Sequence, residues 1–362
     1  MRSTPVLRHR LRRRARRTLV LALGLLALAN VAGWGALQAR ARLRDPMYYQ
    51  RADLLESRTR APDHPFVVVA LGSSRVQRGF APSAVHLEPR LSQALGRPAV
   101  VFNFGVQGSG PLLHELYLHR MLRDGPRPDA LYLEVVPSML FDASGEPRER
   151  ASRSLDARFL RWDELDVLER RGAGWPEMRA EWYKVRAKAL WEYRFQFVWG
   201  ALPVWVPPQY SAPRGAPADA SGWTPIVLDS FPEAMRREAL AGARRDHGRA
   251  VSEGTLHPAP VAALRAICET CRHEQIPLTL VLMPEGPSFR ALYAPEVEAR
   301  VAALLDQLTR EFGVPLVNAR LWVDEPDFTD GHHLLPTGAK RFTARFADEV
   351  LLPDAARWHV AP

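Results

Sequence analysis

The apolar residues of this chain fall into short continuous runs that alternate with amphipathic segments. The first run, 66–71, is entirely apolar and ends at Gly72. Such a run predicts a strand buried on both faces of a sheet, and the amphipathic segment after it predicts a helical crossover. The predicted strands are 66–71, 99–104, 129–136, 277–283 and 314–317, and the predicted helices are 83–95, 112–122, 261–273, 295–312 and 336–351. This alternation predicts an α/β fold with an open, doubly wound, parallel five-stranded sheet in a three-layer arrangement.

The alternation is interrupted between the third and fourth strands, from about 140 to 256. Seven of the ten tryptophans lie in this segment, and the stretch 177–199 is helical in composition, so the segment is predicted to be a large, mostly helical insertion. One interpretation is a lid or an aromatic platform for a sugar polymer or an acyl chain. The other is that the rings form the insertion's own core, which the helical spacing of Trp191, Phe195 and Trp199 favours.

The N-terminal segment predicts the compartment. Residues 18–37 contain no ionisable group, and as a helix they span roughly 30 Å, the thickness of one hydrocarbon core. Eight arginines and no acidic residue precede this segment. The positive-inside rule therefore predicts a cytoplasmic basic tail at 1–17, a single-pass helix in the inner membrane at 18–37, and a periplasmic or otherwise extracytoplasmic remainder. A cleaved signal peptide, with Ala27-Leu28-Ala29 before the cut, is the main alternative, and a buried core helix is another.

The charge of the chain is concentrated in that tail. The sequence has 49 basic and 40 acidic residues. Without the eight arginines of 1–17, 41 basic residues face 40 acidic ones, which leaves no basic excess for a phosphate backbone and predicts no nucleic-acid partner. The predicted organisation continues with a linker at 38–65, the α/β domain at 66–352 and a C-terminal tail at 353–362.

Candidate chemistry lies just after the strands, because ligands of open parallel sheets bind at the carboxyl ends of the strands. The first strand ends in Leu71-Gly72-Ser73-Ser74-Arg75. Ser74 is the candidate nucleophile, and its position at a helix start also offers an N–H group to a developing oxyanion. A plain helix cap is the alternative interpretation. After the second strand, the amide of Gly105 is a candidate oxyanion donor.

The most specific pattern follows the fifth strand, where Asp330 precedes His333 by three residues before a predicted helix. A carboxylate in this position can orient one nitrogen of the imidazole while the other accepts a proton from a serine. A structural turn is one alternative, and a zinc site that includes His332 is another. Adjacent histidines point apart, so we expect no metal.

These segments together resemble the SGNH (GDSL-like) hydrolase superfamily. The resemblance covers about 66–138 and 261–350, and the membrane anchor is similar to the extracytoplasmic branch with the D-alanine transfer and alginate acetylation proteins. It implies an SGNH hydrolase-like domain in which Ser74 is the nucleophile, Gly105 an oxyanion donor, His333 the base and Asp330 its orienting acid. One departure concerns the third strand, since no asparagine stands after it to complete the oxyanion hole. Ser138, Arg75 or the backbone is expected to replace that donor.

Glu285 and Arg290 follow the fourth strand, and together with Arg75 and Ser138 they are candidate substrate contacts at the same edge of the sheet. A simple Pro-rich loop is the alternative for that segment.

The expected function is that of a membrane-anchored extracytoplasmic serine esterase or O-acyltransferase that acts on an envelope polysaccharide or an acyl donor and needs no cofactor. A multi-spanning acyl exporter is a candidate partner. The alternative function is a catalytically degenerate module that binds or hands over a cell-surface polymer.

Overall fold

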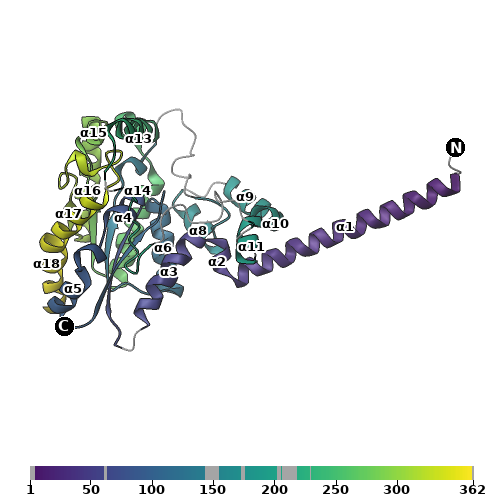
Figure 1. The fold of residues 1–362 in the computed structure, drawn as a ribbon, viewed down its shortest axis with the longest axis horizontal. Coiled ribbons are helices and arrows are strands. Elements are labelled where there is room, and N and C mark those ends of the chain that lie inside the picture. Colours follow the sequence, from purple (N-terminus) through teal and green to yellow (C-terminus); the bar gives the residue numbers. More distant parts are fainter. Residues whose placement is uncertain are drawn as a thin grey trace. The chain divides into compact units, whose positions relative to one another are not determined.

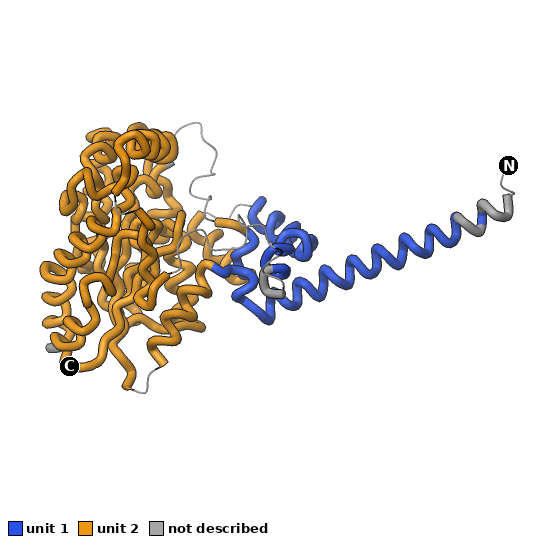
Figure 2. Tube along the Cα trace, in the orientation of Figure 1, with its two compact units in different colours: residues 1–46, 157–161, 175–213 blue, residues 47–156, 162–174, 214–362 orange. Residues whose placement is uncertain are grey.

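The computed structural model describes residues 5–60, 63–142, 155–172, 176–201, 205, 218–228 and 230–360. The chain divides into two compact units (Figure 2). Unit 1 consists of residues 1–46, 157–161 and 175–213, and unit 2 consists of residues 47–156, 162–174 and 214–362.

A five-stranded sheet in the order β2-β1-β3-β6-β7 forms the centre of unit 2 (Figure 1). Every pair of neighbouring strands is parallel. The strands are β1 (Phe66–Gly72), β2 (Ala99–Gly105), β3 (Ala130–Glu134), β6 (Leu278–Leu282) and β7 (Leu316–Asn318). The predicted doubly wound parallel sheet is therefore confirmed, and all five strands lie outside the predicted insertion.

Two groups of helices pack around the sheet. One group is α4 (Ser74–Gly79), α5 (Leu87–Leu95), α17 (Pro336–Phe346) and α18 (Leu352–Val360), and the other is α6 (Pro111–Asp124), α14 (Pro258–His273) and α16 (Pro295–Phe312). Alternate residues of β1, such as Val68 and Ala70, share one buried cluster with Leu91 of α5 and Phe342 of α17. All seven residues of β1 are buried, as expected for a central strand with helices on both faces.

The insertion leaves the sheet domain through a short antiparallel pair. Strand β4 (Phe141–Asp142) pairs with β5 (Thr255–Leu256), so the two ends of the insertion lie together. Helices α8 (Trp162–Arg170) and α13 (Glu233–Glu253) of the insertion belong to unit 2. A short helix, α15 (Pro287–Arg290), follows β6.

Helices lie within both the predicted linker and the predicted C-terminal tail. Helix α3 (Pro46–Thr59) occupies much of the linker, and its Tyr48 ring lies 5.5 Å from that of Phe104. Arg51, also from α3, donates to the carbonyl of Asn103 at 2.9 Å and to that of Gly222. Helix α18 replaces the predicted tail and packs Ala355 into the core cluster. Apolar and aromatic side chains at helical spacing explain both differences.

Unit 1 combines the N-terminal helix with part of the insertion. It contains α1 (Pro5–Ala39), α2 (Ala41–Arg44), α9 (Pro176–Ala187), α10 (Ala189–Glu192) and α11 (Arg194–Ala201). Near the end of α1, Asn30 Oδ1 accepts a hydrogen bond from the amide of Leu190 at 3.2 Å. A Cβ at Gly33 would lie 3.2 Å from the Leu190 side chain, so glycine allows α1 and α10 to approach closely.

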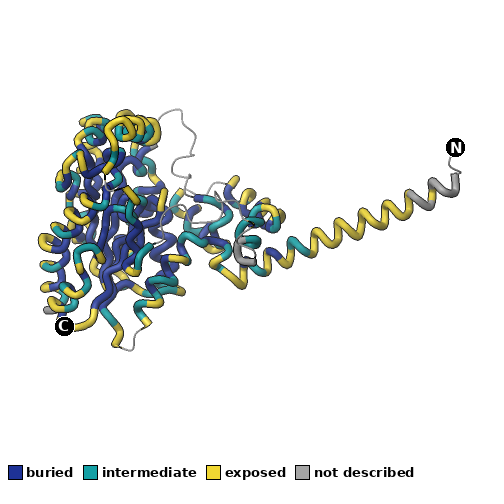
Figure 3. Tube along the Cα trace, viewed as in Figure 1, coloured by how far each residue is buried: buried dark blue, intermediate teal, exposed yellow. Residues whose placement is uncertain are grey.

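The apolar part of α1 is exposed along most of its length (Figure 3). The helical segment 12–39 is long and apolar enough to cross a membrane. It is the one such segment among the described helices. A signal sequence near an N-terminus has the same properties, so the helix by itself establishes neither the compartment nor the orientation.

The tryptophans of the insertion do not form one core. Trp182 is buried in unit 1 and donates to the carbonyl of Leu160, whereas Trp191 is 65% exposed. Trp223 packs into the core cluster of the sheet in unit 2. The prediction that these rings form the insertion's own core is therefore wrong for Trp191 and Trp223. Trp175 and the side chain of Trp199 lie outside the described residues.

Gly105 allows the first crossover helix to pack directly on the sheet. A Cβ at this position would lie 2.1 Å from the amide nitrogen of Gln77 in α4 and 2.8 Å from the carbonyl oxygen of Ser73. Both neighbours are backbone atoms, which cannot move aside as a flexible side chain does. The glycine is required by this contact.

We expect Gly105→Ala to destabilise the protein by about 1–3 kcal/mol, because the new methyl group forces strand β2 and helix α4 apart. Chemical denaturation of the purified chain measures this change. Gly242→Ala, at an uncrowded position of helix α13, is the matched control and should be neutral or slightly stabilising. Equal stability of the two variants would contradict this account of Gly105.

Candidate active site

Ser74 lies at the carboxyl end of the central strand β1, as the first residue of helix α4. Ser73 is the N-cap, and its hydroxyl accepts a hydrogen bond from the amide of Arg75 at 3.1 Å. The amide of Ser73 donates in turn to the buried carboxylate of Glu134, at 2.6 Å. These contacts fix the turn and leave the Ser74 side chain partly exposed.

The loop before helix α17 carries the other two predicted residues. A single bridge between Phe328 and Leu334 closes this loop. Gly331 has a φ of 82°, a left-handed conformation that favours glycine, and the turn brings Asp330 back against the residues that follow. Asp330 Oδ1 accepts hydrogen bonds from the amide of His333 at 2.8 Å and the amide of His332 at 3.1 Å.

The structure brings Ser74, His333 and Asp330 into one hydrogen-bonded chain. Asp330 Oδ2 lies 2.6 Å from His333 Nδ1, and His333 Nε2 lies 2.8 Å from Ser74 Oγ. A carboxylate accepts only from the protonated nitrogen of an imidazole, so Nδ1 carries the proton and Nε2 accepts from the serine. This is the arrangement that activates a serine for nucleophilic attack.

The electrostatics of the loop favour a charged aspartate beside a neutral His332. Burial opposes ionisation of Asp330, but its electrostatic interactions with His333 and His332 and the hydrogen bonds from His333 outweigh this effect and hold the pKa of Asp330 well below its usual range. Burial, with the nearby His333, lowers the pKa of His332 well below 6.5. His332 is therefore neutral near pH 7, and the Asp330 carboxylate has the imidazole of His333 as its side-chain hydrogen-bond partner.

Arg75 and Glu285 lie inside the protein, which corrects the expectation that they contact substrate. They are 4% and 0% exposed. Arg75 Nη1 pairs with Glu285 Oε1 at 3.1 Å, and Nη2 donates to the carbonyls of Met283 and Pro284. A buried guanidinium requires such partners, since an unpaired buried charge is strongly unfavourable.

Two further predicted residues also have structural partners. Arg290 donates to the carbonyls of Glu285 and Arg320, so its guanidinium holds the loop after β6. The amide of Gly105 donates to Asn103 Oδ1 at 2.9 Å. It is therefore occupied within the protein, which corrects the expectation that it serves as an oxyanion donor.

Ser138 follows strand β3 and has a partner that the sequence did not indicate. Its hydroxyl lies 2.9 Å from Nδ1 of His247, a residue of helix α13 in the insertion. The His247 ring lies 5.1 Å from that of His332, which lies 4.1 Å from that of His333. Glu134 was also missed, although an acidic residue within an apolar strand was a usable signal. A histidine in a polar helix gave none.

Asp330, His332 and His333 also have ligand atoms close enough together to hold a metal ion. However, Asp330 Oδ2 and both ring nitrogens of His333 already take part in the chain that ends at Ser74. The described geometry therefore fits a proton-transfer chain.

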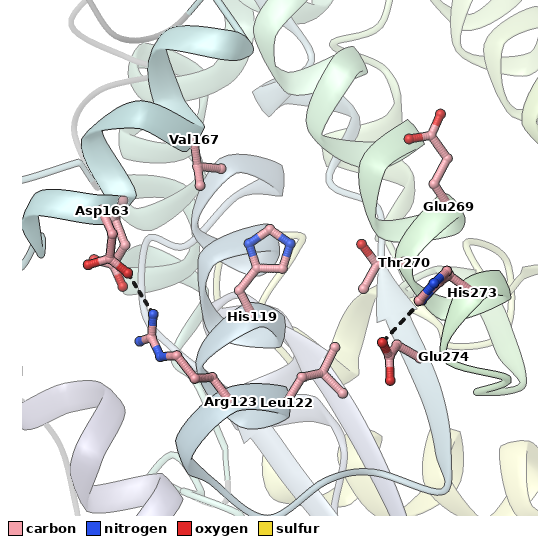
Figure 4. A pocket seen from close by; sticks show the side chains of 10 residues that line it. His119, Leu122, Arg123, Asp163, Val167, Glu269, Thr270, His273 and Glu274 are labelled. Carbon is pink, nitrogen blue, oxygen red and sulfur yellow. Dashed lines mark hydrogen bonds and ion pairs between the residues drawn. The ribbon is translucent and has the colours of Figure 1, made fainter.

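A surface pocket of about 590 Å³ lies elsewhere in unit 2, between helices α6, α8 and α14 (Figure 4). None of the predicted site residues lines it. Two of its acidic groups are already paired, Asp163 with Arg123 and Glu164 with Arg120. Its lining includes none of Ser74, His333 and Asp330.

Ser74, His333 and Asp330 form a continuous hydrogen-bonded chain at the carboxyl edge of a parallel sheet. This geometry is the one found in the active sites of serine hydrolases. No protein-family model matches this chain, and a search of curated proteins finds no match. Several of the solved structures that this chain resembles are described as esterases or acylhydrolases.

These include a lipase/acylhydrolase from Enterococcus faecalis, with 12% identity and a TM-score of 0.35, covering 79% of this chain and 95% of that one. AlinE4, an SGNH-hydrolase family esterase, has 14% identity and a TM-score of 0.34, covering 80% and 97%. A carbohydrate acetylesterase family member from Sinorhizobium meliloti has 14% identity and a TM-score of 0.33, covering 79% and 99%. The chemistry has to be assigned from this chain's own residues.

The buried histidines predict that acid destabilises the folded protein. Burial lowers the pKa of His114 to about 3 and that of His247 to about 4, and it lowers that of His332 as well. Below about pH 6.5 the unfolded chain binds protons at these positions and the folded chain does not. Stability should therefore fall as the pH decreases, by at most about 1.4 kcal/mol per pH unit for each histidine.

Denaturant unfolding at pH 7, 6 and 5 measures this dependence. His114→Gln should flatten the profile, because it removes one titrating group while keeping a polar partner for Ser109, which lies 3.0 Å from His114 Nε2. Replacement of the exposed His273 is the control and should leave the slope unchanged. A stability that is constant between pH 7 and pH 5 would contradict the prediction.

Proposed function

We propose that this chain is a membrane-anchored serine esterase or O-acyltransferase that works outside the cytoplasm through an acyl-Ser74 intermediate. The observation that carries the proposal is the continuous hydrogen-bonded chain from Asp330 through His333 to Ser74. Residues so far apart in the sequence form this chain only because the fold brings the two loops together.

The chemistry follows from the positions of the protons. His333 Nε2 accepts the proton of Ser74 as its oxygen attacks the carbonyl carbon of an ester, and the protonated imidazole then gives this proton to the departing alcohol. Asp330 holds the imidazole in the required tautomer and stabilises its charge. Water that attacks the acyl-serine completes hydrolysis, whereas a sugar hydroxyl completes transfer.

The setting of the site supports an envelope substrate. The apolar part of helix α1, residues 18–37, and the arginines before that part favour an anchored protein whose sheet domain lies outside the inner membrane. Acyl esters of a cell-surface polysaccharide, or an acyl donor delivered by a multi-spanning exporter, are the substrates that this placement favours. We propose that the chain belongs to the extracytoplasmic branch that its sequence resembles, which includes the D-alanine transfer and alginate acetylation proteins.

Ser74→Ala and His333→Ala should each lower kcat/KM for a generic acetyl ester by several orders of magnitude, since each removes a participant in bond making. Asp330→Asn should lower it less, because the imidazole remains in place. Steady-state kinetics on the purified full chain in detergent, with fluorophosphonate labelling of Ser74, measures this. Wild-type protein that neither turns over esters nor reacts with the probe would favour the polymer-binding alternative.

A reporter enzyme fused after Pro362 tests the topology. We expect a reporter that works only in the periplasm to be active, because the arginine-rich tail is retained in the cytoplasm and the rest of the chain is exported. A control fusion that lacks residues 1–37 should be inactive. A wild-type fusion active only with a cytoplasmic reporter would refute the orientation.

A further inference from the structure

Ester cleavage by Ser74 requires hydrogen-bond donors for the carbonyl oxygen, which becomes negatively charged in the transition state. The amide of Ser74 at the start of α4 is one predicted donor. The second predicted donor, the amide of Gly105, is occupied by Asn103. Arg75, the other replacement suggested by the sequence, has its guanidinium directed at buried carboxylates and carbonyls. Of the replacements that the sequence suggested, Ser138 and the backbone remain.

Ser138 is placed to contribute to the same edge of the sheet. Strands β1 and β3 are neighbours, with Leu71 paired to Leu133, so the segments after them emerge side by side. Ser74 follows one strand and Ser138 follows the other. The His247 ring approaches from the insertion, with its Nδ1 2.9 Å from the Ser138 hydroxyl and its ring next to that of His332.

The pair of Ser138 and His247 has one donor left over in either tautomer of the histidine. If His247 Nδ1 accepts the Ser138 proton, then Nε2 carries a hydrogen that is not used in the pair. If Nδ1 carries the hydrogen and donates it to Ser138, then the serine hydroxyl is free to donate. The imidazole is neutral near pH 7 because burial lowers the pKa of His247 to about 4.

We propose that the Ser138–His247 pair donates the hydrogen bond that stabilises the oxyanion during attack by Ser74. The inference rests on the proposed esterase or acyltransferase function and deepens it. As Ser74 Oγ bonds to the carbonyl carbon, its proton moves to His333 and the carbonyl π electrons move to the oxygen, where the pair donates. Collapse of this intermediate re-forms the carbonyl, and the alcohol leaves with the proton from His333.

This inference gives the insertion a direct part in the chemistry. His247 belongs to helix α13, which contacts the segment that holds Ser138 and the helix after β6. The Phe289 ring, 5.8 Å from that of His247 and 4.7 Å from that of His332, packs beside both imidazoles. The donor would thus be held by packing, which is what preorganised stabilisation of a transition state requires.

Kinetics of single and double variants test the proposal on the full chain in detergent, with a generic acetyl ester. At least one of Ser138→Ala and His247→Ala should lower kcat by about 10²–10³, the loss typical of one oxyanion donor, with KM changed only a few-fold. The double variant should be no slower than the slower single variant, because the pair supplies one donor. His247→Gln, which keeps an N–H donor, should retain more activity than His247→Ala.

Ser252→Ala, at an exposed position on α13, and His273→Ala, an exposed histidine on α14, are matched controls and should behave as wild type. Circular dichroism and thermal melting establish that each variant is folded, and His247→Gln serves if His247→Ala does not fold. If the wild type is active and the folded Ser138 and His247 variants keep its kcat, or differ from it only in KM, the oxyanion-donor proposal is overturned. The proposed function is unaffected by that result. Wild type without turnover or probe labelling overturns both.

Discussion

The candidate site depends on a buried carboxylate that holds the turn carrying Ser74. Glu134, at the end of β3, accepts the amide of Ser73 at 2.6 Å, one residue before Ser74. A Cβ at Gly72 would lie 2.6 Å from the same carboxylate oxygen, so glycine and glutamate are required together. Burial raises the pKa of Glu134, and the charge of Arg75 opposes this by favouring the ionised form.

That carboxylate begins a chain of alternating charges beneath the sheet edge. Arg75 lies between Glu134 and Glu285, and Arg320 Nε pairs with Glu285 at 2.5 Å. Removal of Arg75 takes the ion-pair partner from the buried Glu134, and the loss of one partner of a buried ion pair typically costs about 3–5 kcal/mol. Arg75, the residue after Ser74, is thus part of the buried ion-pair network that supports the site. Its burial explains why a position next to Ser74 in sequence does not face the substrate.

The sequence predicted what depends on local spacing and on periodicity. Continuous apolar runs such as 66–71 predicted the strands, and the spacing of Asp330 and His333 predicted the hydrogen-bonded pair that the structure shows, because three residues of a tight turn suffice to join them. Gly105 was singled out as a glycine that permits close approach, but the partner is helix α4 and not a substrate. Contacts such as Arg51 with the carbonyl of Asn103 depend on the full fold, and no local pattern encodes them.

The insertion could be located but not interpreted for the same reason. His247 lies in a helix rich in arginine and glutamate, where a histidine is unremarkable, and only the pairing of β4 with β5 and the packing of α13 bring it to Ser138. Its neutrality matters as much as its position. A second imidazolium beside His333 would repel the positive charge that forms there when Ser74 attacks. Burial of His247 and His332 keeps both rings neutral, so Asp330 can stabilise the one imidazole that has to become charged.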